Sequence, residues 1–360
     1  MTKLIGVSTG FSQNLLEFCL RMAATRVMVV RPWASPHGEE IQDEEILSQT
    51  AISEEAARVA MRELREDEAT RAHGLQQMKE WIRKNKDVDN VRTDNSFLLR
   101  FLRAKKFSLP MAQNQLLKYL NLRQTFSHMM MNLDYTIPPV LELINNGYLF
   151  ASPVRDKFGR RVILANAAPL DPHKYDCIAQ AKVHMLTYET LLEDEDNHVF
   201  GFNHIGDVKA GQAAHITMWS VTEIATIFKW GEQSVPMRHK EIHIVNIPTP
   251  YKYVYDFCSG RLSPKIRERA HVHTSLASLH AKVDPSVLPK EWGGVIPIAD
   301  MIESWKQELA SKRESLLALD KMKILDNSSI LKRRNGGTEK SRKAIEDMCI
   351  TGSFRKLEVD

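Results

Sequence analysis

The feature that most constrains the fold is an alternation of strand-like and helix-like segments in the second half of the chain. Runs rich in β-branched and aromatic residues at about 198–204 and 242–246 predict strands, and the longer segments at about 177–192 and 216–233 predict helices. Strands separated by helices need crossover connections, and crossovers join parallel strands. This part of the chain therefore predicts an α/β fold with a mostly parallel sheet.

A hairpin is expected just before these crossovers. Strand-like runs at 147–153 and 161–165 lie on either side of an Asp-Lys-Phe-Gly turn, in which Gly159 supplies the backbone freedom that tight turns need. The hairpin and the crossovers together define one large domain, which we place at residues 137–309.

Residues 53–130 are expected to form a small all-helical domain that precedes the sheet. Charged and apolar residues between 53 and 85 follow a helical spacing, which predicts one or two amphipathic helices. Asp94, Asn95 and Ser96 each offer a cap for a further helix that contains the run 97–103. Ser108, with a proline two positions later, can begin another helix.

The two ends of the chain are expected to lie outside these domains. The first 33 residues hold four basic side chains against the single acid Glu17, a composition that resembles a mitochondrial presequence. We prefer the interpretation in which residues 1–52 form a disordered leader. Residues 310–360 are expected to form a polar C-terminal tail.

Composition limits the partners and the compartment. The net charge of +4 arises from 49 basic and 45 acidic residues, which does not indicate a nucleic-acid partner. No apolar run is long enough to span a bilayer, so membrane contact is expected to be peripheral. Cys19, Cys177, Cys258 and Cys349 are far apart, which is typical of reduced thiols in a cytoplasmic protein.

The chain lacks the sequence patterns of familiar α/β enzymes. It has no glycine-rich dinucleotide motif, no P-loop and no nucleophile elbow. His239, Glu241 and His243 carry metal-binding groups, but they lie at a predicted strand and lack the helical spacing of a zinc protease, so we interpret them as structural or solvated. We expect no enzyme activity, no cofactor and no metal, with an unrecognised catalytic site as the alternative.

Five short motifs occur in an order that resembles the CRAL-TRIO family of lipid-transfer proteins. The resemblance covers residues 54–309. The motifs are SFLLRFLRAKKF at 96–107, DKFGRRV at 156–162, IHIVN at 242–246, KIRER at 265–269 and LPKEWGG at 288–294. Each motif is weak alone, but their shared order makes the resemblance specific.

The resemblance implies a sheet that forms the floor of an apolar cavity, which holds one hydrophobic ligand and is closed by a gate helix at 248–262. Tyr251, Val254, Tyr255 and Cys258 follow a helical spacing, so one stripe of this helix could cover the ligand. The alternative is that this stripe is ordinary core.

The resemblance also implies that the helix at 180–192 lines the cavity. The residues expected on the wall are Ala181, His184, Met185 and Tyr188. His184 and Tyr188 stand where a tocopherol-binding member of the family has small hydroxyl residues, which puts tocopherol itself in doubt. These two side chains could equally be packed structural residues.

Basic residues crowd the start of a helix that Ser263 and Pro264 are expected to begin. Cations oppose the helix dipole at that end, whereas an anion is stabilised there. The resemblance implies that a phosphoinositide headgroup binds basic residues from three segments. They are Lys105, Lys106, Arg238, Lys240, Lys265, Arg267 and Arg269. The alternative is a set of solvated charges.

We therefore expect a monomeric carrier that transfers a hydrophobic small molecule or lipid between membranes. Phosphoinositide binding would promote its docking on endosomal or other intracellular membranes and the release of the ligand. The alternative is a phosphoinositide-binding trafficking adaptor without a transfer role, in which the basic segment 332–343 recruits a partner.

Overall fold

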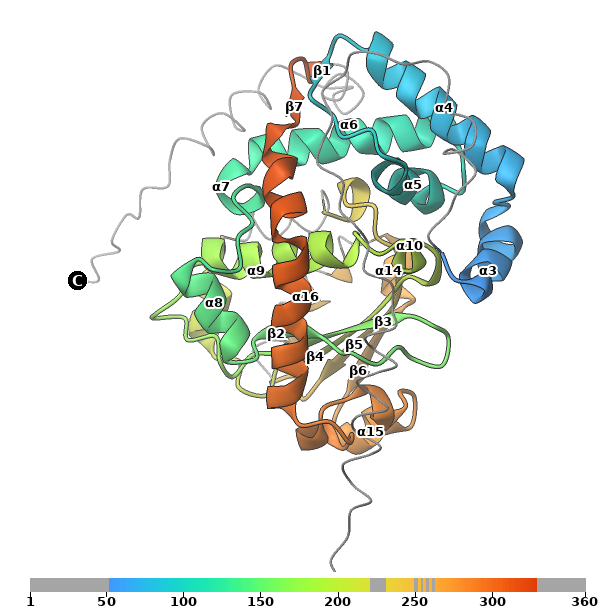
Figure 1. Cartoon of the computed structure of the whole chain (residues 1–360). Coiled ribbons are helices and arrows are strands. Elements are labelled where there is room, and N and C mark those ends of the chain that lie inside the picture. The colour runs from blue at the N-terminus through green and yellow to red at the C-terminus, as the bar shows by residue number, and fades with distance from the viewer. Residues whose placement is uncertain are drawn as a thin grey trace, which may run out of the picture. The chain divides into compact units, whose positions relative to one another are not determined.

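The computed structural model of the protein describes residues 52–220, 231–248, 252–253, 255–256, 259–260 and 263–328. The expected leader, apart from Ile52, and the end of the expected tail, 329–360, lie outside the described residues. Within the described part, a helical region precedes a sheet that has helices on both faces (Figure 1). This arrangement confirms the predicted α/β class.

Capped helices build the N-terminal region. They are α3 (Glu54–Leu64), α4 (Glu68–Lys84), α5 (Asn95–Ala104) and α6 (Leu109–Thr125), followed by the shorter α7 (Ser127–Met130) and α8 (Pro138–Asn145). The side chains of Ser53, Asp67 and Asp94 accept hydrogen bonds from backbone N–H groups of the first turns of α3, α4 and α5. Of the three caps offered at 94–96 the helix uses Asp94, and the predicted start at Ser108 is confirmed.

Five strands form the main sheet in the spatial order β2-β3-β4-β5-β6. The strands are β2 (Leu149–Ala151), β3 (Arg161–Asn166), β4 (Phe202–Asp207), β5 (His239–Val245) and β6 (Ala270–His273). The β2–β3 pair is antiparallel, as the hairpin predicts, and Gly159 has a φ of 75° in its turn. The other neighbouring pairs are parallel, which confirms the predicted crossovers.

Two segments differ from the sequence prediction. Residues expected to begin a strand at 198 instead end a helix, α10 (Glu195–Phe200), because Asp194 caps it and Gly201, with a φ of 79°, ends it. The helix expected from Pro264 ends after one turn as α14 (Pro264–Arg267), and the chain then forms the edge strand β6, which the sequence did not predict.

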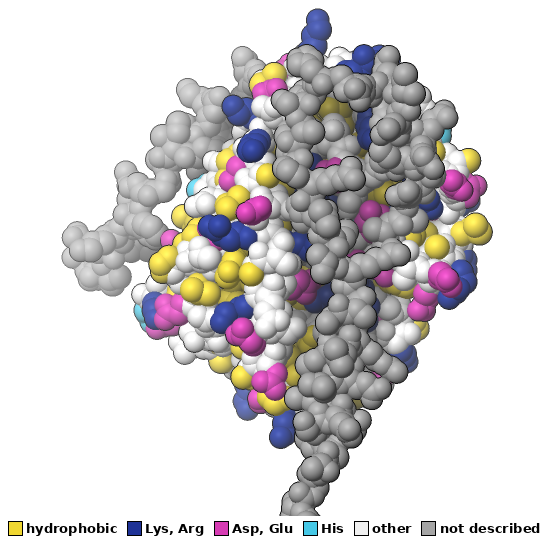
Figure 2. Space-filling view, viewed as in Figure 1, with side chains coloured by type: hydrophobic (Ala, Val, Ile, Leu, Met, Phe, Trp, Pro, Cys, Tyr) yellow, Lys and Arg dark blue, Asp and Glu magenta, His cyan; other side chains and the backbone are white. Residues whose placement is uncertain are grey.

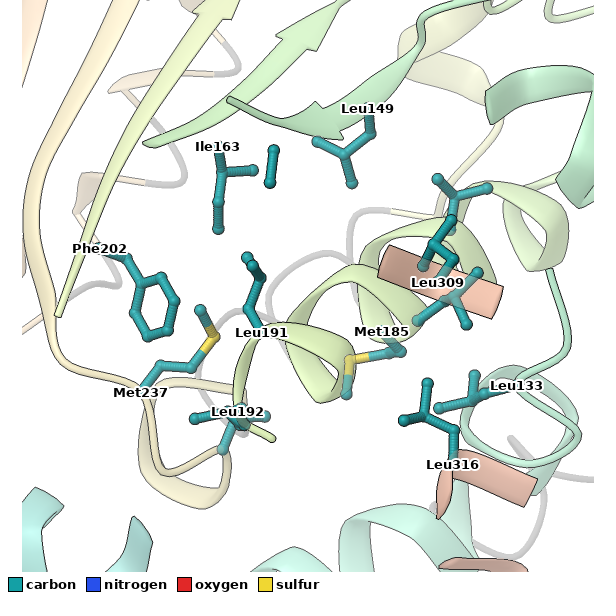
Figure 3. Packing of buried hydrophobic residues seen from close by; sticks show 14 of the residues in the cluster. Leu133, Leu149, Ile163, Met185, Leu191, Leu192, Phe202, Met237, Leu309 and Leu316 are labelled. Carbon is teal, nitrogen blue, oxygen red and sulfur yellow. The ribbon is translucent and has the colours of Figure 1, made fainter. Parts of the chain in front are cut away.

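The two faces of the sheet are covered by different helices. In Figure 1, α9 (Cys177–Leu191) and α16 (Ile298–Ala318) lie on one face, which we call the inner face, and α15 (Leu276–His280) lies on the other. The short 3-10 helices η1 (Pro285–Val287) and η2 (Lys290–Trp292) follow α15. Figure 3 shows Leu149 and Ile163 pointing from the inner face towards α9.

The C-terminal boundary of the fold lies beyond the expected position. Helix α16 continues past residue 309 and is followed by η3 (Leu319–Lys321) and β7 (Lys323–Ile324), which pairs antiparallel with β1 (Val88–Asp89). The expected tail therefore starts inside α16. Its first part is held because Leu316, Leu319 and Ile324 are buried in the main core.

Candidate ligand-binding and anion-binding sites

The inner face of the sheet is closed at Ile163 on β3 but partly open along the next row of residues, which runs from β3 to β6. Ile163, on β3, is only 2% exposed. The next row across the sheet consists of Ala165, Gly206, Ile244 and Val272, which pair in register from β3 to β6. The first three are partly exposed and Val272 is 44% exposed, although apolar side chains on parallel strands are normally buried.

The surroundings of Gly206 also indicate free space above this row. A Cβ atom added at Gly206 would meet only the Cβ of Ala165, at 3.9 Å. Gly206 has ordinary strand geometry, so neither its backbone nor a close neighbour requires glycine there. The apolar floor formed by this row therefore has room above it.

A line of hydrogen-bonded side chains borders this floor. Gln180, His184 and Tyr188 are spaced four residues apart on α9 and so share one side of that helix. The indole N–H of Trp219 donates to Gln180 Oε1 at 2.7 Å, and Gln180 Nε2 donates to the hydroxyl of Tyr148 at 2.9 Å. His184 Nε2 lies 2.9 Å from that hydroxyl, and His184 Nδ1 lies 3.3 Å from the hydroxyl of Tyr188.

Two histidines on the strands lie at the end of this line. The ring of Tyr188 meets that of His204, on β4, edge to face with 6.1 Å between centroids. His204 Nε2 lies 2.8 Å from His239 Nδ1 on β5. The register of β4 against β5 shifts between Phe202 and Asn203. His239 therefore lies beside His204 on the inner face, whereas Glu241 and His243 lie on the opposite face. From the sequence alone, His239 is grouped instead with Glu241 and His243.

These histidines are neutral at physiological pH. Burial lowers the pKa of both His184 and His239 to about 4, and it lowers the pKa of His204 as well. Burial also raises the pKa of Tyr188 to about 12. The line beside the floor therefore carries hydrogen-bonding groups without net charge.

The expected wall residues fall into two sets. His184 and Tyr188 belong to the hydrogen-bonded line, whereas Ala181 and Met185 are buried members of the main core. In Figure 3, Met185 extends from α9 towards the side where Leu133 and Leu316 lie, away from Ile163 and the sheet. The place of Ala181 and Met185 on the wall of a ligand cavity stays a prediction.

The expected gate is described only in part. Tyr251, Val254 and Cys258 lie outside the described residues. Tyr255 is in helical conformation and partly buried, and the neighbouring Lys252 and Asp256 are exposed. The closing role of this segment stays a prediction.

A second set of histidines occupies the opposite face of the sheet. His243 Nδ1 lies 2.9 Å from His273 Nε2, and His243 Nε2 lies 3.2 Å from Glu241 Oε2. His273 Nδ1 in turn lies 3.2 Å from the hydroxyl of Ser278. These pairings account for the buried imidazoles, and among the described residues no group of three or more metal-binding side chains could hold an ion.

Basic residues from two distant segments come together near the start of β5. Partial burial lowers the pKa of Lys265, and the positive charges of Arg269, Arg238 and Lys106 lower it further. Burial lowers the pKa of Lys105 too, with added repulsion from Lys118 and Lys265. We call Lys105, Lys106, Lys265 and Arg269 the cation cluster. No ion pair joins the cluster to a carboxylate among the residues that the structure describes.

Arg238 and Lys240 have a partner within the protein. Both donate to Glu63 Oε2 of α3, at 2.7 and 2.9 Å. Burial alone would raise the pKa of Glu63, but these hydrogen bonds and charges lower it to about 2. Arg267, the remaining expected contact, is exposed on α14. Of the seven basic residues expected to bind a headgroup, two therefore already bind a carboxylate of the protein.

A buried network that sequence analysis missed joins the helical region to the sheet domain. Arg103 is fully buried and donates to Glu66 at 2.8 Å and to Glu195 at 2.8 Å. Arg100 donates to Glu189 at 3.1 Å and Glu193 at 2.7 Å. The presence of two arginines inside the apolar run 97–103 could have indicated this network, because a buried guanidinium group needs carboxylate partners.

The charge distribution elsewhere is mixed. Figure 2 shows basic and acidic side chains interspersed over the visible described surface on the side of α16. The basic character of the cation cluster is therefore local, in agreement with the small net charge. No helix within the described residues is both long and apolar enough to cross a membrane.

Comparison with known proteins identifies two matching family descriptions. Residues 145–294 match the CRAL/TRIO domain, and residues 74–118 match the CRAL/TRIO N-terminal domain. The two matches coincide with the sheet domain and with helices α4 to α6.

Three curated proteins illustrate the similarity. Clavesin-2 of Rattus norvegicus is 29% identical over 72% of this chain and 80% of its own length. Clavesin-1 of Xenopus laevis is 32% identical over 69% of this chain and 74% of its own. Alpha-tocopherol transfer protein-like of Mus musculus is 29% identical over 74% of this chain and 77% of its own.

Proposed function

Because this chain belongs to the CRAL/TRIO family, whose members bind and transfer lipids, we propose that it is a non-enzymatic carrier of one hydrophobic ligand. The ligand lies over the open part of the inner face, between the floor and the line of side chains from Trp219 to His239. Both the absence of enzyme activity and a monomeric state belong to this proposal.

The observation that carries the proposal is the apolar row Ala165, Gly206, Ile244 and Val272, with room above Gly206. Covering apolar surface contributes about 25 cal/mol per Å² before the losses of freedom on binding are subtracted. A long hydrocarbon can therefore bind this floor without a charged contact. The neutral side chains along its border suit the same class of ligand.

Membrane docking is assigned to the cation cluster. A basic side chain near an anionic membrane surface contributes about 1 kcal/mol, so several together give useful affinity for phosphoinositide headgroups. Lys105 and Lys265 come from separate segments yet repel each other, so an anion placed between them relieves that repulsion. Docking of this kind would occur at the cytoplasmic surface of endosomal or other intracellular membranes.

We further assign a link between docking and ligand release. Arg269 donates a hydrogen bond to the backbone carbonyl of His239, and His239 contacts His204 beside the floor. An anion that draws the guanidinium of Arg269 away would disturb the start of β5 and hence the border of the ligand site. The expected gate, 248–262, follows the same strand in the chain.

Native mass spectrometry of the purified protein tests the carrier function. We expect one apolar molecule bound per chain, and Gly206→Leu should remove it because the added side chain fills the space above the floor. Gly206→Ala is the matched control, since one methyl group fits at 3.9 Å from Ala165. An empty wild-type protein that still binds phosphoinositide vesicles would instead favour the adaptor function.

A further inference from the structure

The hairpin turn between β2 and β3 presents an aromatic ring to solvent. Phe158 is 53% exposed. The guanidinium carbon of Arg160 lies 4.4 Å from the centroid of this ring, and Nζ of Lys157 lies 5.2 Å from it. A single exposed apolar side chain is ordinary, but this one combines an apolar surface with two adjacent positive charges. Both properties suit contact with a surface that is negatively charged and apolar beneath.

The turn holds Phe158 in place through its own hydrogen bonds. Asp156 Oδ1 accepts from the backbone N–H groups of Phe158 and Arg160, both at 2.9 Å. The N–H of Gly159 donates to the carbonyl of Asp156 at 2.9 Å, and Arg155 Nη1 donates to the carbonyl of Gly159 at 2.9 Å. The backbone of the turn therefore keeps the ring exposed, and little freedom is lost when the ring binds another surface.

The same turn lies at the end of the sheet where the basic residues gather. Strands β3 to β6 are parallel, so the segments that lead into them arrive at one end of the sheet. Arg160, Arg238 and Arg269 directly precede β3, β5 and β6. In Figure 1, α10 and α14 lie close together at this end. Neighbouring strands are about 4.8 Å apart, so the starts of β3 and β6 are about 15 Å apart.

Ion pairs and charges join the turn to the basic residues of β5. Arg160 Nη1 lies 2.9 Å from Glu241 Oε1. Burial lowers the pKa of Lys240, the charges of Arg238 and Arg160 lower it further, and Glu63 opposes these effects. The positive charge at this end of the sheet therefore extends as far as the turn that carries Phe158.

Packing joins the turn to the same residues. A Cβ atom added at Gly159 would lie 2.9 Å from the ring of Phe200, the last residue of α10. A Cβ atom added at the next residue, Gly201, would lie 3.0 Å from the side chain of Lys240. The turn, the end of α10 and the start of β5 are thus in continuous contact.

We propose that Phe158 is a membrane anchor, whose ring enters the headgroup region of an anionic bilayer beside the cations. A phenylalanine flanked by lysine and arginine suits that region, because the ring leaves water while the charges stay among the phosphate groups. A folded protein partner would call for an apolar patch of several residues, whereas one ring beside cations fits a bilayer that is negative at its surface and apolar below. This inference rests on the proposed docking function and adds an apolar contact to it.

Vesicle co-sedimentation of the full-length protein tests the anchor, with phosphatidylcholine vesicles that contain phosphatidylinositol bisphosphate. We expect Phe158→Ser to bind these vesicles about five- to tenfold more weakly than the wild type, because the apolar surface of the ring is lost. Phe158→Leu should bind within about threefold of the wild type, since it keeps an apolar side chain without the ring. All three proteins should bind soluble inositol trisphosphate equally, because this probe has the headgroup phosphates and no bilayer.

A matched control and salt separate the anchor from other causes. Leu325, which follows β7, is 64% exposed and lies outside the five-stranded sheet, so Leu325→Ser should bind vesicles as the wild type does. Salt screens charges but not apolar contacts. The ratio between wild type and Phe158→Ser should therefore persist at high salt, where the effect of Lys105→Ala/Lys265→Ala shrinks. Thermal unfolding verifies that each variant is folded.

The remaining outcomes contradict the anchor in different ways. Equal vesicle binding by the wild type and a folded Phe158→Ser protein would overturn it while leaving docking through the cation cluster intact. Binding by Phe158→Leu as weak as that of Phe158→Ser would assign the ring to holding Arg160 instead, and so would a loss of inositol trisphosphate binding. Equal weakening by Leu325→Ser would remove its specificity. Failure of the wild type to bind the vesicles would overturn the docking function together with the anchor.

Discussion

Arg103 and Lys105 are two residues apart, yet they show the two ways in which this protein uses a cation. Arg103 is fully buried and holds Glu66 and Glu195, so it fastens α5 to α3, α4 and α10. Lys105 is partly exposed, and the charges that act on it are those of Lys118 and Lys265, which lower its pKa, and of Glu232, which raises it. The comparison teaches that pairing, rather than charge itself, separates structural cations from cations available to a ligand.

The strongest way to break this comparison is to remove the paired cation. Arg103→Leu leaves Glu195 buried without its counter-ion and Glu66 paired with Arg71 alone, and we expect it to lower the free energy of unfolding by about 3 to 5 kcal/mol. Chemical denaturation measures the loss. Arg58→Ala is the control: its pair with Glu54 spans 3.9 Å and is exposed, so a change above about 1 kcal/mol there would contradict the distinction.

Acid titration separates the buried network from other sources of stability. Burial would raise the pKa of Glu193, but Arg100 and Arg92 lower it to about 2, below the ordinary 4.5. The ionised form therefore stabilises the fold fully above pH 4.5, and this contribution is lost between pH 4.5 and 2. We expect Glu193→Gln to lower the free energy of unfolding by about 1 to 3 kcal/mol at pH 7.

The difference between Glu193→Gln and wild type should then shrink as the pH falls below 4.5. Unfolding curves at pH 7, 4 and 3 measure it. A difference that stays constant over this range would show that the pairing of Glu193 with Arg92 and Arg100 does not stabilise the fold through its charge.

Glu63 offers a smaller effect that sharpens the comparison. It pairs with Arg238 and Lys240, so it competes with any anion for these two cations. We expect Glu63→Gln to strengthen binding to phosphoinositide vesicles about two- to fivefold, since a partly exposed pair contributes about 1 kcal/mol or less. Vesicle co-sedimentation measures it, with Glu55→Gln on the exposed side of α3 as the control. Weaker binding by Glu63→Gln would exclude a competing role.

Much of the fold follows from local signals in the sequence. The capping residues at 94–96 and 108, the Gly159 turn and the alternation of strands and helices predicted elements that are present. Strand β4 was placed too early, because Val199 and Phe200 have strand propensity and a helix cap at Asp194 overrides it. Strand β6 was missed because it has only four residues and two are histidines.

The site was less predictable because its contacts join distant parts of the chain. The cations of the cluster could be found in short basic motifs, but Glu63 lies 175 positions from Arg238, and nothing in the local sequence joins them. The pairing of His204 with His239 depends on a register shift that changes which face of β5 each residue occupies. Only the folded arrangement reveals such partners.

The most direct test of the central claim is the binding of Lys105→Ala/Lys265→Ala to vesicles that contain phosphoinositide. Neither ammonium group donates a hydrogen bond to another described residue, so the variant should unfold at the same temperature as the wild type. The control is Lys86→Ala/Lys321→Ala, which removes the same charge from two exposed positions elsewhere.

We expect the Lys105→Ala/Lys265→Ala protein to bind about tenfold or more weakly than both the wild type and the control, from a loss of about 1 kcal/mol per lysine. Its bound hydrophobic ligand should be retained. Equal vesicle binding by the two double variants would contradict the assignment of the cation cluster as the docking site.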